Sequence, residues 1–243
     1  MSVSSTTAFT LTRDEIIQYA LRKIGVLEAG VTPDATTVAN SSTALNMLIK
    51  SWIAKGIKLW TVTELTLPLT VSQNSYVIGP AGPDLVTHKP MRLIQGWLRN
   101  VSVTPQNDIP LQLLSKFDYN TLGSKQSTGV PNSIFVDVQR DSATTYLYPS
   151  PNNSAVSLYQ VHMVVQRPLL DVSTATDNAD FPSEWLSAIG WNLAAELATD
   201  FGVDAERLQY IESKAAKALM EMEDWDIEHT SVYFAPNLRF SRQ

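Results

Sequence analysis

The densest group of side chains that could do chemistry is an acidic cluster near the C-terminal end, made of Glu221, Glu223, Asp224, Asp226 and Glu228. Paired carboxylates can act as the acid and base of a glycosidase, or they can bind a cation. On a helix, Glu221 and Glu228 would share one face, while Glu223 and Asp226 would share another. Acidic residues at the C-terminal end of a helix oppose its dipole, so a solvated face or a partner's basic patch is the simpler explanation. We therefore predict that the chain is not an enzyme.

The histidines and glycines form no catalytic or metal-binding pattern. His88, His162 and His229 lack ligand spacing, and His162, with apolar residues on either side, is predicted to face solvent from a strand. The chain has no cysteine, which excludes disulfides, thiolate metal sites and a cysteine nucleophile. No G-x-S-x-G, Walker A or G-x-G-x-x-G motif occurs, and Gly79–Gly82 carries prolines where amides would have to cradle a phosphate. No catalytic, cofactor or metal site is predicted.

The composition is that of a folded protein with little surface charge. Its 243 residues can bury a sizeable core, and 44% of them are hydrophobic. Charged residues make up 17%, against roughly a quarter in average proteins. Such a surface suits a subunit that is buried against its neighbours, and it suits an ordinary β-rich surface equally well.

Neither nucleic-acid binding nor membrane insertion is indicated. The net charge is −6, the pI is about 5.0, and the longest basic run is Arg22-Lys23, so no basic face for duplex DNA is visible. The N-terminus lacks the basic and apolar regions of a signal peptide. No run approaches the ~20 apolar residues that span a bilayer.

Two helices are predicted before residue 56. Thr12 and Glu15 have the spacing of a capping box, and apolar residues then line one face of a short helix up to Gly25. A second helix is predicted from about Thr36 to Lys55. Its apolar face consists of Leu45, Leu48, Ile49, Trp52 and Ile53.

The pattern changes after this second helix. Gly56 is predicted to end it in a left-handed conformation, and Ile57, Leu59, Trp60 and Val62 are predicted to begin extended chain. The spacing of the apolar residues changes from a period of 3.6 to a period of 2 within a few residues. The chain is therefore expected to pass here from a helical layer into a β layer.

Residues 61–170 are predicted to form strands and turns. Turn signals recur at short intervals, which indicates an antiparallel sandwich or barrel and not a parallel doubly wound sheet. The segment Ser115–Pro131 is predicted to form a helical turn and a long loop. The predicted strands are VTELTLPLTV, SYVIG, MRLIQGWLR, IPLQLL, SIFVDVQ, TTYLYP and AVSLYQVHMVVQRPL.

A polar connector over residues 171–183 leads to a second helical pair. Asp204 is predicted to cap the last helix, and Gly202 to break the one before it. The first helix has the stripe Leu186, Ile189, Leu193, Leu197 and Phe201, and the second has the seam Leu208, Ile211, Ala215, Ala218, Met222 and Trp225. Each pair needs a partner for its apolar stripe, so the two pairs are expected to form one four-helix bundle.

The predicted fold is therefore α+β: a helical bundle built from both chain ends, an inserted antiparallel β module, and an extended C-terminal tail. The expected divisions are a helical pair at 1–61, the β module at 62–170, a second helical pair at 171–228, and the tail at 229–243. The tail has apolar and aromatic residues without helical or strand period. It is expected to dock on a partner or back on its own bundle.

The order of these elements resembles the head-to-tail adaptor proteins of short-tailed bacteriophages, the tail accessory factor and tail tubular protein A group. The matching features are the pattern A…LN-x-L-x-x-x-W followed by K-G and L-W, the β-rich middle, Phe181-Pro182-Ser183-Glu184-Trp185 before apolar Ala188–Ala198, and an extended tail. The resemblance covers most of the chain.

The resemblance implies a structural virion protein at the head–tail junction, assembled in the host cytoplasm. Its subunits would form a dodecameric ring that binds the portal protein, extends the DNA channel without binding DNA specifically, and supports the tail nozzle. The loops Gly79–Lys89 and Ser115–Pro131 would face the nozzle. The tail residues that would bind the portal are Tyr233, Phe234, Leu238, Arg239 and Phe240.

Two other functions remain open at this point. One is a carbohydrate- or receptor-binding β module on a helical stalk, which would bind through exposed aromatic residues. The other is a glycan hydrolase that uses the carboxylates of the acidic cluster.

Overall fold

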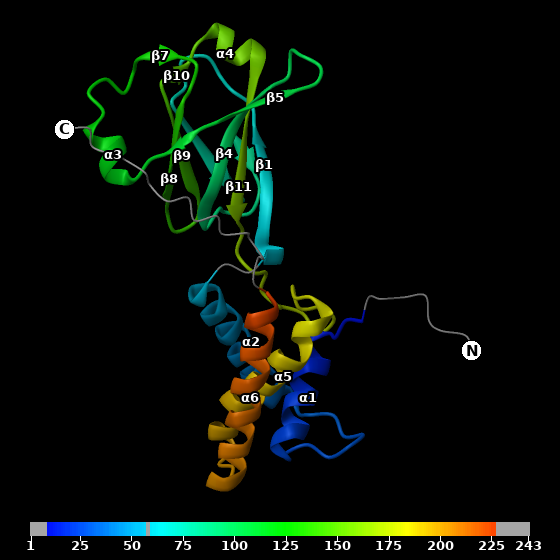
Figure 1. The fold of residues 1–243 in the computed structure, drawn as a ribbon. Helices are drawn as coiled ribbons and strands as arrows, with labels where there is room; N and C mark the ends of the chain where they lie inside the picture. Colours follow the sequence, from blue (N-terminus) through cyan, green and yellow to red (C-terminus); the bar gives the residue numbers. More distant parts are fainter. Residues whose placement is uncertain (1–8, 57–58, 227–243) are drawn as a thin grey trace, which may run out of the picture.

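A computed structural model of the protein describes residues 9–56 and 59–226. The chain forms an elongated molecule with a helical bundle at one end and a β module at the other, joined by a narrow waist (Figure 1). Each part has its own hydrophobic core, one formed by helices and one formed by strands. The predicted α+β fold is confirmed, with helices at both ends of the chain and antiparallel sheets between them.

The first two helices begin where local capping chemistry places them. In α1 (Arg13–Ile24), the Thr12 amide donates to Glu15 Oε2 at 2.8 Å and the Glu15 amide donates to Thr12 Oγ1 at 3.4 Å, which confirms the capping box. Gly25 ends α1 with φ of 79°. Asp34 caps α2 (Ala35–Lys55) by accepting from the amides of Thr36 and Thr37.

The left-handed cap predicted at Gly56 is wrong. Gly56 has φ of 162° and ψ of −178°, which is extended backbone that any residue can adopt. The Gly56 carbonyl accepts from Nε2 of Gln166, the last residue of β11 (Tyr159–Gln166), at 3.3 Å. The predicted strand start is also displaced, because Leu59–Thr61 form a short 3-10 helix, η1, before strand β1 begins at Val62.

The second helical pair completes the bundle. A short 3-10 helix, η2 (Ser183–Trp185), leads into α5 (Leu186–Asp200), and Asp204 caps α6 (Ala205–Trp225) by accepting from the Arg207 amide at 3.0 Å. Helix α5 contacts α1, α2 and α6, so the predicted packing of the two pairs into one bundle is confirmed. The apolar stripes are buried or partly buried as predicted except at their ends, since Phe201 is 38% and Trp225 is 63% exposed.

The β module is a sandwich of two sheets around one core, and not a closed barrel. One sheet has the order β1-β11-β4-β5 and the other β3-β2-β9-β8-β6, and β10 and β7 form a separate pair. The longer strands pair antiparallel, while the short pairs β2–β3, β6–β8 and β7–β10 are parallel. The strands are β1 (Val62–Leu67), β2 (Ser75–Gly79), β3 (Leu85–Val86), β4 (Arg92–Asn100), β5 (Asn107–Pro110), β6 (Gln112–Leu113), β7 (Thr128–Gly129), β8 (Ser133–Val138), β9 (Ala143–Tyr148), β10 (Ser150–Pro151) and β11 (Tyr159–Gln166).

Two details of the predicted strands need correction. The segment IPLQLL is divided between β5 and β6, which belong to different sheets. The start of AVSLYQVHMVVQRPL is part of a helix, α4 (Asn153–Leu158), because the Asn152 side chain accepts from the Ala155 amide at 2.8 Å and caps it. The helical turn expected in Ser115–Pro131 is present as α3 (Lys116–Thr121).

The chain enters and leaves the β module side by side. Val62, the first residue of β1, lies opposite Gln166, the last residue of β11, and the Arg167 amide donates to the Thr61 carbonyl at 2.9 Å. The whole β module is therefore inserted between α2 and α5 through two adjacent antiparallel segments.

Candidate assembly surfaces

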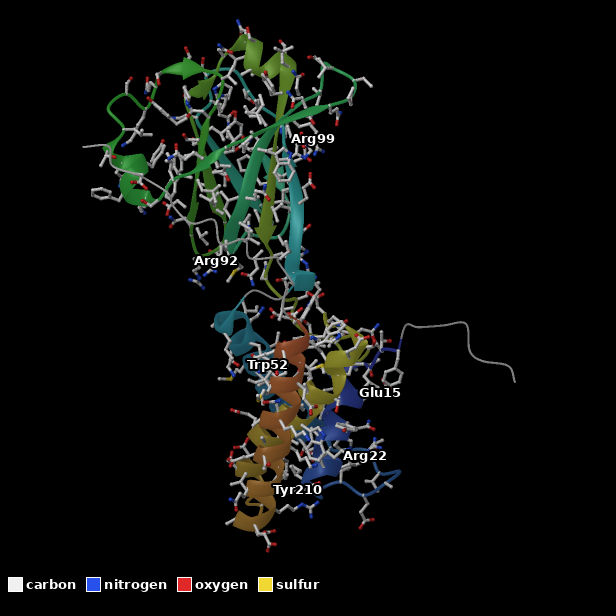
Figure 2. The ribbon with its side chains drawn as sticks, in the orientation of Figure 1. Glu15, Arg22, Trp52, Arg92, Arg99 and Tyr210 are labelled. Carbon is white, nitrogen blue, oxygen red and sulfur yellow. The ribbon has the colours of Figure 1, made fainter. Side chains whose placement is uncertain are left out.

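Four aromatic side chains close the bundle where it meets the waist. Trp52 of α2, Trp60 of η1, Phe181 and Trp185 of η2 lie with ring centroids 5.0 to 6.2 Å apart. Figure 2 labels Trp52 on the bundle side of the waist and Arg92 on the β side. Aromatic pairs at these separations add to the stability gained from burial alone. Trp52 and Trp60, which lie where the sequence predicts the change from helix to strand, therefore pack together with Phe181 and Trp185 at the junction of the two modules.

An ion pair holds the chain that leaves the β module against the segment that precedes η2. Arg167 Nη1 donates to Asp180 Oδ2 at 2.5 Å and Arg167 Nη2 donates to Asp180 Oδ1 at 2.9 Å. Both side chains are only about one-fifth exposed, and the hydrogen bonds raise the pKa of Arg167. Asp180 also accepts from the Leu170 amide, and its carbonyl accepts from Trp60 Nε1 at 3.1 Å. The pair thus ties the exit of β11 to the entry of the second helical pair.

The predicted polar connector is held against the bundle along its length. Asn46 of α2 donates to the Val172 carbonyl at 3.0 Å and accepts from the Val172 amide at 2.9 Å. Lys50 forms an ion pair of 2.5 Å with Asp171. Arg13 Nη1 donates to the Ser173 carbonyl at 2.7 Å. These contacts fix the connector to α1 and α2.

Within the connector, Asp177 closes a local turn. Its carboxylate accepts from the amides of Ser173 and Thr174 and from the Thr174 hydroxyl. The hydrogen bond from the Thr174 side chain, followed by those from the backbone, lowers the pKa of Asp177. The connector is therefore ordered by its own hydrogen bonds as well as by the bundle.

The prediction that His162 faces solvent is wrong. His162 lies on the outer face of its sheet, but it is only 7% exposed because Trp97, its cross-strand neighbour, stacks against it at 5.7 Å. His162 Nδ1 donates to Glu64 Oε1 at 2.6 Å. Beside it, Arg99 makes two hydrogen bonds to Asp108, which lower the pKa of that carboxyl. Strand alternation identifies the face of a residue but not what covers it.

The candidate chemistry of the acidic cluster receives little support from its surroundings. Glu221 lies 3.7 Å from Lys217, one helical turn earlier, in an exposed pair. Among the described residues, no group of three or more His, Asp or Glu side chains is placed to hold a metal ion. Glu228 lies outside the described residues, as do the tail residues Tyr233, Phe234, Leu238, Arg239 and Phe240.

The contacts of the waist could not be identified from the sequence. Asn46, Arg167 and Asp180 carry no local signal, because each finds its partner through chain segments that are far apart or irregular. The one signal in the sequence is Asn46 itself, because a polar residue within an apolar helical pattern indicates a polar contact.

The described residues thus form a helical bundle and a β sandwich that meet at a waist of packed aromatic rings and paired polar groups. A model of the family described as SU10 adaptor protein matches residues 11–238. The chain therefore belongs to this family of phage head–tail adaptors, which confirms the resemblance stated above. No curated protein matches the chain. No helix within residues 9–56 and 59–226 is long and apolar enough to cross a bilayer.

Proposed function

We propose that this phage adaptor protein forms a dodecameric ring that binds the portal protein, extends the DNA channel and supports the tail nozzle. The observation that carries the proposal is the braced waist, because it joins two different modules into one elongated subunit. Such a subunit can meet a different partner at each end while the distance between the partners stays fixed. The divisions at residues 61/62, 170/171 and 228/229 are part of this proposal.

The bundle would contact ring neighbours and the portal. The tail residues Tyr233, Phe234, Leu238, Arg239 and Phe240 would anchor the ring to the portal. The net charge of −6 would help a channel wall to let DNA slide, since like charges repel. The protein would then reside at the head–tail junction of the virion, after assembly in the host cytoplasm.

The end of the β module away from the waist would face the nozzle. Three valines are exposed in the turns that connect β1 to β2 and β4 to β5: Val71, Val101 and Val103 are 45%, 41% and 43% exposed. The Val101 amide donates to the Leu158 carbonyl at the end of α4, and the Ser72 amide donates to the Pro151 carbonyl just before α4. Both turns therefore lie close to α4. Exposed apolar side chains grouped in this way favour contact with another protein.

Of the two loops expected to face the nozzle, one turns the other way. Gly79–Lys89 leads back to the waist, where Lys89 and Met91 line a groove together with Ile53 of α2. Ser115–Pro131 reaches the opposite end through β7, which pairs with β10. Only the second loop is therefore included in the proposed nozzle surface.

Sedimentation of the purified protein, alone and with the portal protein of the same phage, tests the proposal. We expect a small species alone and a stable ring on the portal, because the portal raises the local concentration of subunits. A monomer that never associates with the portal would refute the adaptor mechanism. Glycan-binding and hydrolysis assays would then test the two other functions.

A further inference from the structure

The two flanks of α6 carry opposite charge. On the side toward α1, Arg207 Nη2 donates to the Lys23 carbonyl at 3.2 Å, and Lys214 lies about two turns further along the same flank. Two aromatic rings accompany these cations: Lys23 Nζ is 5.0 Å from the Trp191 ring and Lys214 Nζ is 5.5 Å from the Tyr210 ring. We call Lys23, Arg207, Tyr210 and Lys214 the basic flank.

The positive charge of this basic flank is only partly compensated. Asp204, the N-cap of α6, and Glu206 line the same hollow as Lys23, Arg207 and Tyr210. With Lys214, the flank therefore has three cations against two carboxylates. Tyr210 is 57% exposed, so the flank presents an aromatic surface as well as positive charge. Figure 2 labels Tyr210 in the half of the bundle away from the β module.

The opposite flank of α6 borders an acidic groove. Glu212 lines this groove with Glu196 of α5 and with Leu48 and Trp52 of α2. Among the described residues that line the groove, Lys55 is the one cation. Asn192 holds the floor of the groove together by donating to the Ala215 carbonyl of α6 at 3.1 Å. We call Glu196 and Glu212, with the groove between them, the acidic groove.

One charged residue of each surface lies at nearly the same level along α6. Glu212 and Lys214 are two residues apart in α6, which corresponds to a rotation of about 200° around the helix and a rise of about 3 Å. A contact between the basic flank of one copy and the acidic groove of the next would therefore relate the copies by rotation with little translation along the axis. Heterologous contacts give rings when the rotation between copies closes and open filaments when it does not, and a small rise is compatible with closure.

We propose that a second copy of this chain occupies the acidic groove, with its basic flank facing Glu196 and Glu212, and that repetition of this contact builds the ring. The inference rests on the proposed adaptor function and assigns the surfaces that join its subunits. Exposed ion pairs contribute little affinity each, so the charges set the direction and register of the contact. Tyr210 on one copy, and Leu48 and Ala195 in the groove of the next, supply apolar area at the contact.

Charge reversal at the two positions tests the assignment. Glu212→Lys makes both surfaces basic, and Lys214→Glu places a carboxylate in the basic flank. Both substitutions exchange good helix formers at exposed positions, so α6 is expected to keep its fold. We expect each variant alone to form rings on the portal protein at least roughly tenfold less well than the unaltered protein, measured by sedimentation, because like charges would face each other.

Mixing and combining the variants provides the decisive result. In an equal mixture, the unaltered Lys214 of one variant meets the unaltered Glu212 of the other, and the two substituted side chains meet as a carboxylate and an ammonium group. Rings of alternating subunits should therefore form again. The double variant Glu212→Lys/Lys214→Glu restores the pair in reverse and also assembles.

Asp224→Lys is the matched control for these variants. It reverses an exposed charge about three turns beyond Glu212 on the same helix, outside both the basic flank and the acidic groove. We expect it to leave ring assembly on the portal unchanged.

Each result has a distinct meaning. If the unaltered protein forms rings and both single variants do too, the surfaces are wrongly assigned while the adaptor function stands. If the single variants fail and neither the mixture nor the double variant assembles, the effect is not a pairing between copies and the inference is also overturned. If the unaltered protein forms no ring on the portal, the proposed function and this inference fall together.

Discussion

Arg167 and Asp180 are thirteen residues apart and form the tightest polar contact between the β module's exit and the second helical pair's entry. The guanidinium presents two parallel donors to the two carboxylate oxygens, an arrangement that specifies orientation as well as proximity. Because Asp180 also accepts from the Leu170 amide, the pair fixes the backbone between its members. The angle at which the chain returns to the bundle is therefore set by side chains, at a place with no regular secondary structure.

Breaking this pair is expected to loosen the waist. Arg167→Ala leaves a largely buried carboxylate without its main partner, and we expect a loss of about 2 kcal/mol in the free energy of unfolding. Urea denaturation measures it. The double variant Arg167→Ala/Asp180→Ala should lose less than the sum of the single losses, because the two groups interact directly.

Arg140→Ala is the control for this prediction. Arg140 is 95% exposed and lies 3.8 Å from Asp141, so its removal should change stability by less than about 0.5 kcal/mol. Strictly additive losses at Arg167 and Asp180 would show that the two side chains are not coupled.

Gly190 is expected to tolerate no side chain, because α1 and α5 approach closely there. A Cβ atom at this position would lie 2.5 Å from Cε1 of Tyr19. Gly190→Ala gains about 1 kcal/mol of helix propensity but overpacks the core by about 1 to 3 kcal/mol, so we expect a net loss of stability. Thermal unfolding of Gly190→Ala should show a lower midpoint.

Gly123→Ala provides the comparison for Gly190→Ala. No atom lies within 4 Å of the position that its Cβ would take, and stability should change little. An unchanged midpoint in Gly190→Ala would mean that Tyr19 moves aside without cost.

Acid is expected to weaken the start of α2 through Asp34. Hydrogen bonds from the Thr37 side chain and backbone hold the pKa of Asp34 below its usual 3.8 in the folded protein. A group with a lowered folded pKa stabilises the protein at pH values above the unfolded pKa, and this contribution is lost as pH falls through the folded pKa. Stability should therefore decline as the pH falls below about 4, in part because of this residue.

Asp34→Asn isolates that contribution because it keeps a cap but cannot ionise. Denaturation midpoints measured from about pH 5 to about pH 2.5 should fall less steeply in Asp34→Asn than in the unaltered protein. Thr37→Ala should give an intermediate slope, since it removes the largest cause of the shift. Parallel curves for all three proteins would contradict the prediction.

The C-terminal tail is expected to be needed for portal binding and not for folding. A protein that ends at Ile227 lacks Tyr233, Phe234, Leu238, Arg239 and Phe240, and we expect it to lose portal binding while it keeps the thermal midpoint of the full chain. Co-sedimentation with the portal measures the first property and circular dichroism the second. Portal binding by the shortened protein would show that the anchor lies elsewhere.

Predictions from the sequence succeeded where local chemistry decides the structure. The capping box of Thr12 and Glu15, the cap at Asp204 and the end of α1 at Gly25 each depend on a few neighbouring residues. The apolar stripes of α5 and α6 were recognisable because helical periodicity exposes which face must be buried.

Predictions failed where distant residues decide. Gly56 is extended and its carbonyl accepts from Gln166, 110 residues away, and the burial of His162 follows from Trp97 on the next strand. Helix α4 was concealed because its residues merge with the apolar run of β11. The partner of Arg167 and the two flanks of α6 could not be recognised from the sequence, because both depend on how separate segments pack together.

The chain enters and leaves the β module at neighbouring positions, because Val62 lies opposite Gln166. The module is therefore an insertion that can be exchanged as a unit. A segment whose two ends lie on neighbouring antiparallel strands can be lengthened, shortened or replaced without separating the helices that it interrupts. Recombination between related phages could therefore substitute one β module for another in a single genetic event. The surface offered at that end of the molecule would change, while the bundle would keep its own core and its own contacts.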